Sequence, residues 1–198
     1  MTEKVSSLRS TELLSEVQPK ERTPLCLKVG AIGHRYIEHT DTLREAFPKI
    51  RNLLQSVFPH VNLLSCKFKV LTSLAEGADR ILARYFMDQY EAELEVYLPL
   101  VRAEFEKDFK GSRSVREFRT FLHSASGIWI PSSPLPRHEA YEVAARELVN
   151  HSNTVVAIWD GHPARGSGGT ADTVSYARKR QIPVIIINPQ TGEVVRQS

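Results

Sequence analysis

The chain has few of the residues that would tie it to a membrane, a metal or an oxidising compartment. Its two cysteines, Cys26 and Cys66, form neither a CxxC pair nor any other metal-ligand spacing. Both thiols suit a reducing compartment, and we expect them to pack as small core hydrophobes. No apolar run has the length of a membrane span, and the N-terminus has no apolar segment of the kind found in secretory signals. The sequence therefore predicts a cytoplasmic protein with no metal site and no membrane segment.

The sequence also lacks a concentrated basic segment. The 26 lysines and arginines outnumber the 23 acidic residues only slightly, which gives a formal net charge of +3 at pH 7. Basic and acidic residues alternate along the chain, whereas duplex-binding domains usually gather their basic residues on one element. The three consecutive basic residues at 178–180 lie at the end of an expected helix, where cations interact favourably with the helix dipole. Nucleic acid is therefore not the expected partner.

What the sequence does contain is a regular alternation of apolar and amphipathic segments. Residues 1–23 are rich in Ser, Thr, Glu and Lys, and we expect a flexible tail with one short helix at 10–17. Residues 24–198 have the length of a single domain. Strands are expected at 25–32, 68–74, 94–100, 128–130, 154–159 and 183–187. Helices are expected at about 43–57, from about 76, at 103–109, 114–123 and 138–150, and after a glycine-rich loop at 161–169.

This alternation predicts the fold class. The segments at 154–159 and 183–187 are continuously apolar, which is typical of parallel strands that are buried on both faces. Alternating strands and helices then predict an α/β, Rossmann-like, doubly wound fold, with a mostly parallel sheet of about six strands and helices on both faces. In such folds, ligands bind beyond the carboxyl ends of the strands.

The loop after the fifth expected strand has the composition of a phosphate-binding loop. Gly168 and Gly169 have no Cβ, so a phosphate can approach their backbone closely. Thr170 is a suitable N-cap for the helix that follows, and the free N–H groups of its first turn attract an anion. A plain flexible loop that ends in a helix cap is the alternative. The position of the loop after a buried strand favours the phosphate interpretation.

Two residues in the loop after the first expected strand are further candidates. Arg35 follows Gly33 and His34, where its guanidinium can make a two-pronged bond to a phosphate; a surface ion pair is the alternative. His34 is the other candidate, but a histidine without a partner does not make a catalytic site.

The loops after the second and fifth expected strands hold the other candidates. Gly77 lies where a helix begins and can let the backbone approach a ligand, and Glu76 lies next to it. Asp79 falls in the first turn of that helix, where the helix dipole favours an acid without any ligand. Asp160 can bind a ribose hydroxyl or a metal, or cap the turn with Gly161. Three phenylalanines after the third expected strand are expected in the core: Phe105, Phe109 and Phe118.

Taken in order, three segments resemble the SLOG superfamily, which is named for the Smf/DprA and LOG proteins. VGAIGHR resembles its opening G-S-R-type segment, and LTSLAEGADRILA resembles its S-G-L-A-x-G-x-D-x-x-A segment. GSGGTADTVSYARKRQIPVIII resembles its glycine–threonine loop, helix and final strand, so the resemblance spans residues 25–187. It implies a Rossmann-like pocket for a nucleotide ligand, no other cofactor, and pairing of copies through helices. The residues it implies for ligand binding are Gly33, His34, Arg35, Glu76, Gly77, Asp160, Gly168, Gly169 and Thr170.

Members of this superfamily differ in function. LOG enzymes release the base from a nucleoside monophosphate, DprA-like proteins bind single-stranded DNA, and others sense nucleotide-derived signals, including in bacterial antiviral systems. The LOG signature has its catalytic glutamate three residues after the threonine of the glycine–threonine pair, and that position here is Thr173. A counterpart of the LOG arginine motif is also missing. A displaced catalytic carboxylate would have to be Asp172, Glu76 or Asp160.

Three functions follow from these residues and this resemblance. We favour binding or sensing of a phosphate-bearing, nucleotide-derived molecule of the ADP-ribose, NAD or nucleoside-phosphate class, because that function needs only the glycine loops, Arg35 and Asp160. The alternative is a LOG-type phosphoribohydrolase with a displaced carboxylate. The third is single-stranded DNA binding of the DprA type, which would need a basic groove with exposed aromatic platforms that the sequence does not show.

Overall fold

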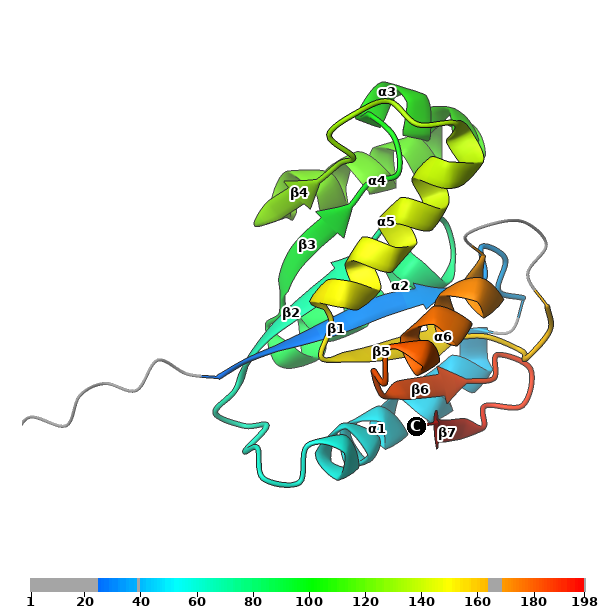
Figure 1. Ribbon diagram of the computed structural model, residues 1–198. Helices are drawn as coiled ribbons and strands as arrows, with labels where there is room; N and C mark the ends of the chain where they lie inside the picture. Colours follow the sequence, from blue (N-terminus) through cyan, green and yellow to red (C-terminus); the bar gives the residue numbers. More distant parts are fainter. Residues whose placement is uncertain (1–24, 39, 164–168, 198) are drawn as a thin grey trace, which may run out of the picture.

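A computed structural model describes residues 25–38, 40–163 and 169–197 of the chain. The expected tail, the short helix predicted at 10–17 and Gly168 lie outside these ranges. A seven-stranded sheet of order β4-β3-β2-β1-β5-β6-β7 runs through the described part (Figure 1). The strands are β1 Cys26–Gly33, β2 Lys67–Thr72, β3 Glu93–Tyr97, β4 Gly127–Trp129, β5 Thr154–Ile158, β6 Val184–Ile187 and β7 Val194–Gln197.

Helices cover both faces of this sheet. They are α1 Thr40–Val57, α2 Ala78–Tyr90, α3 Arg102–Phe105, α4 Gly111–Ser124, α5 Arg137–His151 and α6 Thr170–Lys179, with a 3₁₀ turn at Glu106–Asp108. Apolar side chains of α1, α2 and α4 pack on one face of the sheet, and those of α5 and α6 pack on the other. All strand pairs are parallel except β6–β7. The predicted α/β, Rossmann-like, doubly wound fold is confirmed.

Local sequence explains why these segments form their elements. All five residues of β5 and all four of β6 are buried, as expected for strands that helices cover on both sides. In α1 the buried positions Leu43, Ala46, Ile50 and Leu54 recur every three or four residues, so they form one helical face toward the sheet. The hydrophobic pattern therefore places each element against the core.

The order of the strands creates a crevice at the centre of the sheet. The chain builds β1 to β4 outward in one direction, then returns to place β5 on the other side of β1. The loops that leave the carboxyl ends of β1 and β5 therefore run to opposite sides of the sheet. Ligands of open α/β sheets bind at such a reversal of strand order.

The sequence-based prediction misses one strand and shifts several boundaries. The antiparallel edge strand β7 follows β6 through a tight turn in which the Gly192 N–H donates to the Asn188 carbonyl. β7 has only four residues, too few for a clear alternating pattern. Helix α2 begins at Ala78 rather than near Glu76. Cys26 and Cys66, expected in the core, are only partly buried, near the amino ends of β1 and β2.

A close backbone contact joins β1, β5 and α2 at the crevice. The His34 N–H donates to the Ile158 carbonyl at 3.0 Å, and the His34 carbonyl accepts from the Ala78 N–H at 2.9 Å. Gly77 has φ +81°, and a Cβ placed there would lie 2.3 Å from the Arg35 carbonyl oxygen. Gly77 was predicted to let the backbone approach a ligand. In the structure the group that approaches it is the 34–35 backbone.

This contact predicts that Gly77→Ala destabilises the protein. The substitution forces a positive φ on a residue with a Cβ and pushes the 34–35 backbone away, so we expect a loss of about 2–4 kcal/mol in the free energy of unfolding. Gly111→Ala is the matched control, because Gly111 has φ +79° but a Cβ placed there would meet no other atom within 4 Å. Urea unfolding of both variants measures the difference. Equal losses would show that backbone strain alone matters at Gly77.

Candidate functional site

A cleft of about 1040 Å³ opens at the carboxyl edge of the sheet. Its lining comes from the loops after β1, β2, β3, β5 and β6, and from α3, α5 and the start of α6. Six of the predicted binding residues line it. They are Gly33, His34, Arg35, Asp160, Gly169 and Thr170. The sequence therefore identified much of this cleft.

The N-terminus of α6 faces the cleft through Gly169, Thr170, Ala171 and Thr173. Gly169 occupies the N-cap position that was predicted for Thr170, and Thr170 is the first helical residue. The first helical hydrogen bond runs from the Thr173 N–H to the Gly169 carbonyl, so the N–H groups of the three residues before Thr173 have no partner in the helix. With the helix dipole, these groups attract an anion.

The sequence left two interpretations of Arg35, a contact to phosphate and a surface ion pair. In the structure Arg35 both lines the cleft and forms an ion pair. Its guanidinium lies 3.9 Å from the Asp108 carboxylate. Asp108 is already bound by the Arg137 guanidinium and the Tyr141 hydroxyl. Within the described ranges the Arg35 guanidinium donates no hydrogen bond, and its side chain is 33% exposed. Most of its five N–H groups are therefore available to a ligand.

His34 has a partner that the sequence did not reveal. Its Nε2 lies 2.9 Å from Asp160 Oδ1. His162 donates its backbone N–H to the same oxygen at 3.0 Å, and His162 Nδ1 lies 3.2 Å from it. Partial burial raises the pKa of Asp160, but the hydrogen bonds from the N–H of His162 and the imidazole of His34 have a larger, opposite effect. The pKa of Asp160 is therefore lowered to about 2. The carboxylate is thus ionised at neutral pH, caps its own turn as predicted, and orients the imidazole of His34.

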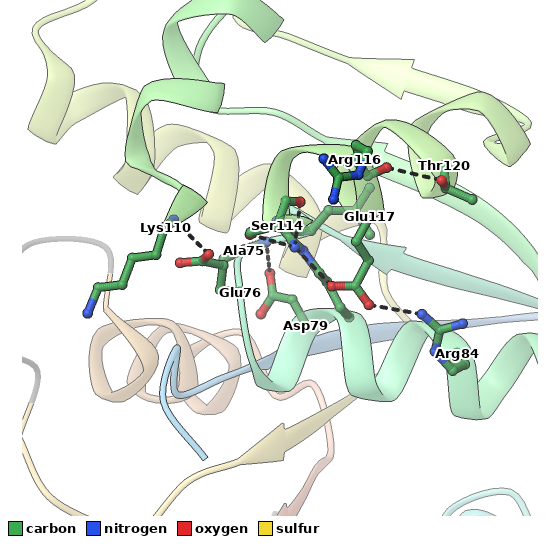
Figure 2. Close-up of polar contacts among 11 residues, drawn as sticks. Ala75, Glu76, Asp79, Arg84, Lys110, Ser114, Arg116, Glu117 and Thr120 are labelled. Atoms are coloured by element: carbon green, nitrogen blue, oxygen red, sulfur yellow. Dashed lines mark hydrogen bonds and ion pairs between the residues drawn. The ribbon is translucent and has the colours of Figure 1, made fainter. Parts of the chain in front are cut away.

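Asp79 also lines the cleft, and its carboxyl is less readily ionised than that of Asp160. Burial raises the pKa of its carboxyl to about 7, although hydrogen bonds from the Ala75 N–H and the Thr72 hydroxyl and the charges of Arg35 and Arg80 act against it. The Ala75 N–H reaches Asp79 Oδ2 at 3.2 Å (Figure 2). Asp79 therefore carries a proton for part of the time near neutral pH. The sequence suggested a structural role, and the structure adds that Asp79 lines the cleft.

The loop that precedes Asp79 is held by a buried arginine for which the sequence predicted no role. Arg80 is 4% exposed, and its Nε donates to the Leu74 carbonyl at 3.0 Å. Its Nη1 donates to the carbonyl and hydroxyl of Ser114 and to Glu117, on α4, and its guanidinium lies over the Phe109 ring. Arg80 therefore connects the loop after β2 to α4.

The inner end of the cleft is apolar and aromatic. Phe105 and Leu148 form its floor with Pro99 and Tyr141. The three phenylalanines predicted for the core are buried, and Phe105 additionally borders the cleft. A pocket with apolar walls and a few convergent polar groups is typical of small-molecule sites.

Three predicted residues do not line this cleft in the described part of the chain. Glu76 accepts a hydrogen bond from the Lys110 N–H at 2.9 Å (Figure 2). Gly77 contacts the 34–35 backbone. Asp172 lines a separate cavity of about 220 Å³ between α5 and α6, with Glu142 and Lys179.

No protein-family model matches the chain, and no curated protein is significantly similar to it. Its site must therefore be interpreted from its own residues.

Two negative findings concern the described ranges alone. None of the helices there is both long and apolar enough to cross a membrane. In the same ranges, no three His, Cys, Asp or Glu side chains are grouped so that they could hold a metal ion.

The buried carboxyl of Asp79 predicts a specific pH dependence of stability. Its pKa rises from 3.8 in the unfolded chain to about 7, so its contribution is fully present below about pH 4 and is lost as the pH rises through 7. Asp79→Asn removes this loss. Relative to wild type, the variant should gain up to about 4 kcal/mol in unfolding free energy between about pH 4 and pH 8.

Urea unfolding of both proteins across this pH range measures the gain. Asp88→Asn, at an exposed position on the same helix, is the control and should show no such gain. A difference between Asp79→Asn and wild type that does not change with pH would contradict the assignment.

Proposed function

We propose that the cleft binds a phosphate-bearing, nucleotide-derived small molecule of the ADP-ribose, NAD or nucleoside-phosphate class. The observation that carries the proposal is the pairing of the α6 N-terminus with the Arg35 guanidinium in one cleft, at the reversal of strand order. Unpartnered N–H groups and an arginine fork are the donors that proteins use for phosphate. The backbone next to Arg35 is held by the hydrogen bonds of His34 to Ile158 and Ala78.

The charges of the cleft suit such a ligand. A carboxyl that is protonated for part of the time, as that of Asp79 is near neutral pH, repels a phosphate less than one that is always ionised. Asp160 is ionised, and an ionised carboxylate accepts hydrogen bonds from hydroxyl groups such as those of ribose. The volume of about 1040 Å³ is at the upper end of small-molecule pockets, which favours a ligand of dinucleotide size.

The placement of two of the three candidate carboxylates favours binding over hydrolysis by the LOG route. Asp172 lines the cavity between α5 and α6, and Glu76 is engaged by Lys110 outside the cleft lining. Asp160, the third candidate, lines the cleft but is paired with His34. Thr173 occupies the LOG glutamate position, and its hydroxyl donates to the Gly169 carbonyl at 3.0 Å. The resemblance to the SLOG superfamily supports the same proposal, with a role in sensing a bacterial signalling or defence molecule.

The proposal predicts that Arg35→Ala weakens ligand binding. Losing hydrogen bonds to a charged group costs about 1.5–3 kcal/mol, so the dissociation constant should rise roughly 10- to 150-fold. Arg35→Lys should recover only part of the affinity, because an ammonium cannot make a bidentate contact. Calorimetry with ADP-ribose, NAD and AMP measures these changes.

The control is Arg44→Ala, which removes an exposed arginine whose partner is Asp41 on α1. It should bind each ligand as wild type does, and thermal unfolding should show that all variants are folded. Wild-type affinity of Arg35→Ala for every ligand would assign Arg35 to the Asp108 ion pair alone.

A further inference from the structure

Tyr36 is an exposed aromatic residue at the edge of the cleft. Its relative exposure is 59%. Among the large hydrophobic side chains that the structure describes as exposed, Tyr36 alone is aromatic and alone lines the cleft. It makes no ring–ring contact with another described aromatic side chain. An apolar surface left open at the mouth of a pocket is a common feature of ligand sites.

A lysine holds this ring from one side. Lys110 Nζ lies 4.2 Å from the centroid of the Tyr36 ring, which is the geometry of a cation–π contact. The backbone of Lys110 is itself fixed, because its N–H donates to Glu76 Oε1 at 2.9 Å (Figure 2). The ammonium therefore occupies one face of the ring, and the other face is the one that a flat ligand group can cover.

The backbone beneath the ring is equally well fixed. Tyr36 directly follows His34 and Arg35, whose backbone is bound to Ile158 and Ala78 and packs against Gly77. A flat, rigid side chain on a fixed backbone loses little conformational entropy when a ligand stacks on it. Tyr36 also lies next in sequence to Arg35, the residue assigned to the phosphate, and both line the same cleft.

We propose that Tyr36 is the platform on which the heteroaromatic base of the bound nucleotide stacks, with Lys110 holding the opposite face of its ring. This inference rests on the proposed function, since it assigns the base of the same ligand. The Glu76–Lys110 hydrogen bond holds the backbone from which this lysine side chain extends.

The test compares probes with and without a base. Calorimetry with ADP-ribose and AMP, which carry adenine, and with ribose 5-phosphate, which does not, is done on wild type, Tyr36→Ala and Tyr36→Phe. Stacking of one base on an aromatic side chain predicts that Tyr36→Ala weakens ADP-ribose and AMP binding by roughly 5- to 150-fold. Affinity for ribose 5-phosphate should not change. Tyr36→Phe is the matched control and should bind all three probes within about 2-fold of wild type, because it keeps the ring face.

The outcomes separate this inference from the proposed function. One outcome is that Arg35→Ala weakens binding of the probes while Tyr36→Ala changes the affinity for adenine-bearing and base-free probes by the same factor. In that case the assignment of Tyr36 as a stacking platform is wrong, and the phosphate site stands. If Tyr36→Phe loses as much affinity as Tyr36→Ala, the hydroxyl and not the ring face matters, and stacking is wrong. If no probe binds wild type, both the site and the platform are wrong.

Discussion

The site depends on the close packing of three backbone segments where β1 ends. His34 is bound through its N–H to Ile158 at the end of β5 and through its carbonyl to Ala78 at the start of α2. Both contacts need glycine beside them: a Cβ on Gly33 would lie 2.3 Å from the Ile158 carbonyl oxygen, and one on Gly77 would lie 2.3 Å from that of Arg35. Side chains at 34, 35 and 36 therefore start from a backbone that has little freedom to move.

The acidic residues in and around the cleft differ in charge state and in partners. Asp160 is ionised and engaged by two histidines, Asp79 is buried with a raised pKa, and Asp108 is bound by Arg137 and Tyr141. Each acidic group thus has a different set of partners, and among the described residues Arg35 makes one long ion pair. An arginine with available donors that lines the same cleft as the start of α6 favours an anionic ligand.

The sequence was sufficient for the fold and for much of the cleft. Buried strands such as β5 are continuous apolar runs, and the reversal of strand order brings their end loops together in any such sheet. The pairing of His34 with Asp160, far apart in the chain, could not be predicted because it depends on which strands are neighbours. The functions of Gly77 and Glu76 could not be predicted either, since their contacts, Arg35 and Lys110, come from other loops. No pattern in the sequence indicated strand β7 or the contacts of Arg80 with α4.

The central claim is that a phosphate-bearing nucleotide occupies the cleft at the start of α6. Amide ¹H–¹⁵N spectra of the labelled protein, recorded as ADP-ribose is added, test it most directly, because the N–H groups that would bind phosphate are themselves observed. We expect the largest shifts at Thr170 and Ala171, with further shifts at 34–36. Shifts confined to the residues around the cavity between α5 and α6, or no shift at Thr170 and Ala171 at saturating ligand, would contradict this account.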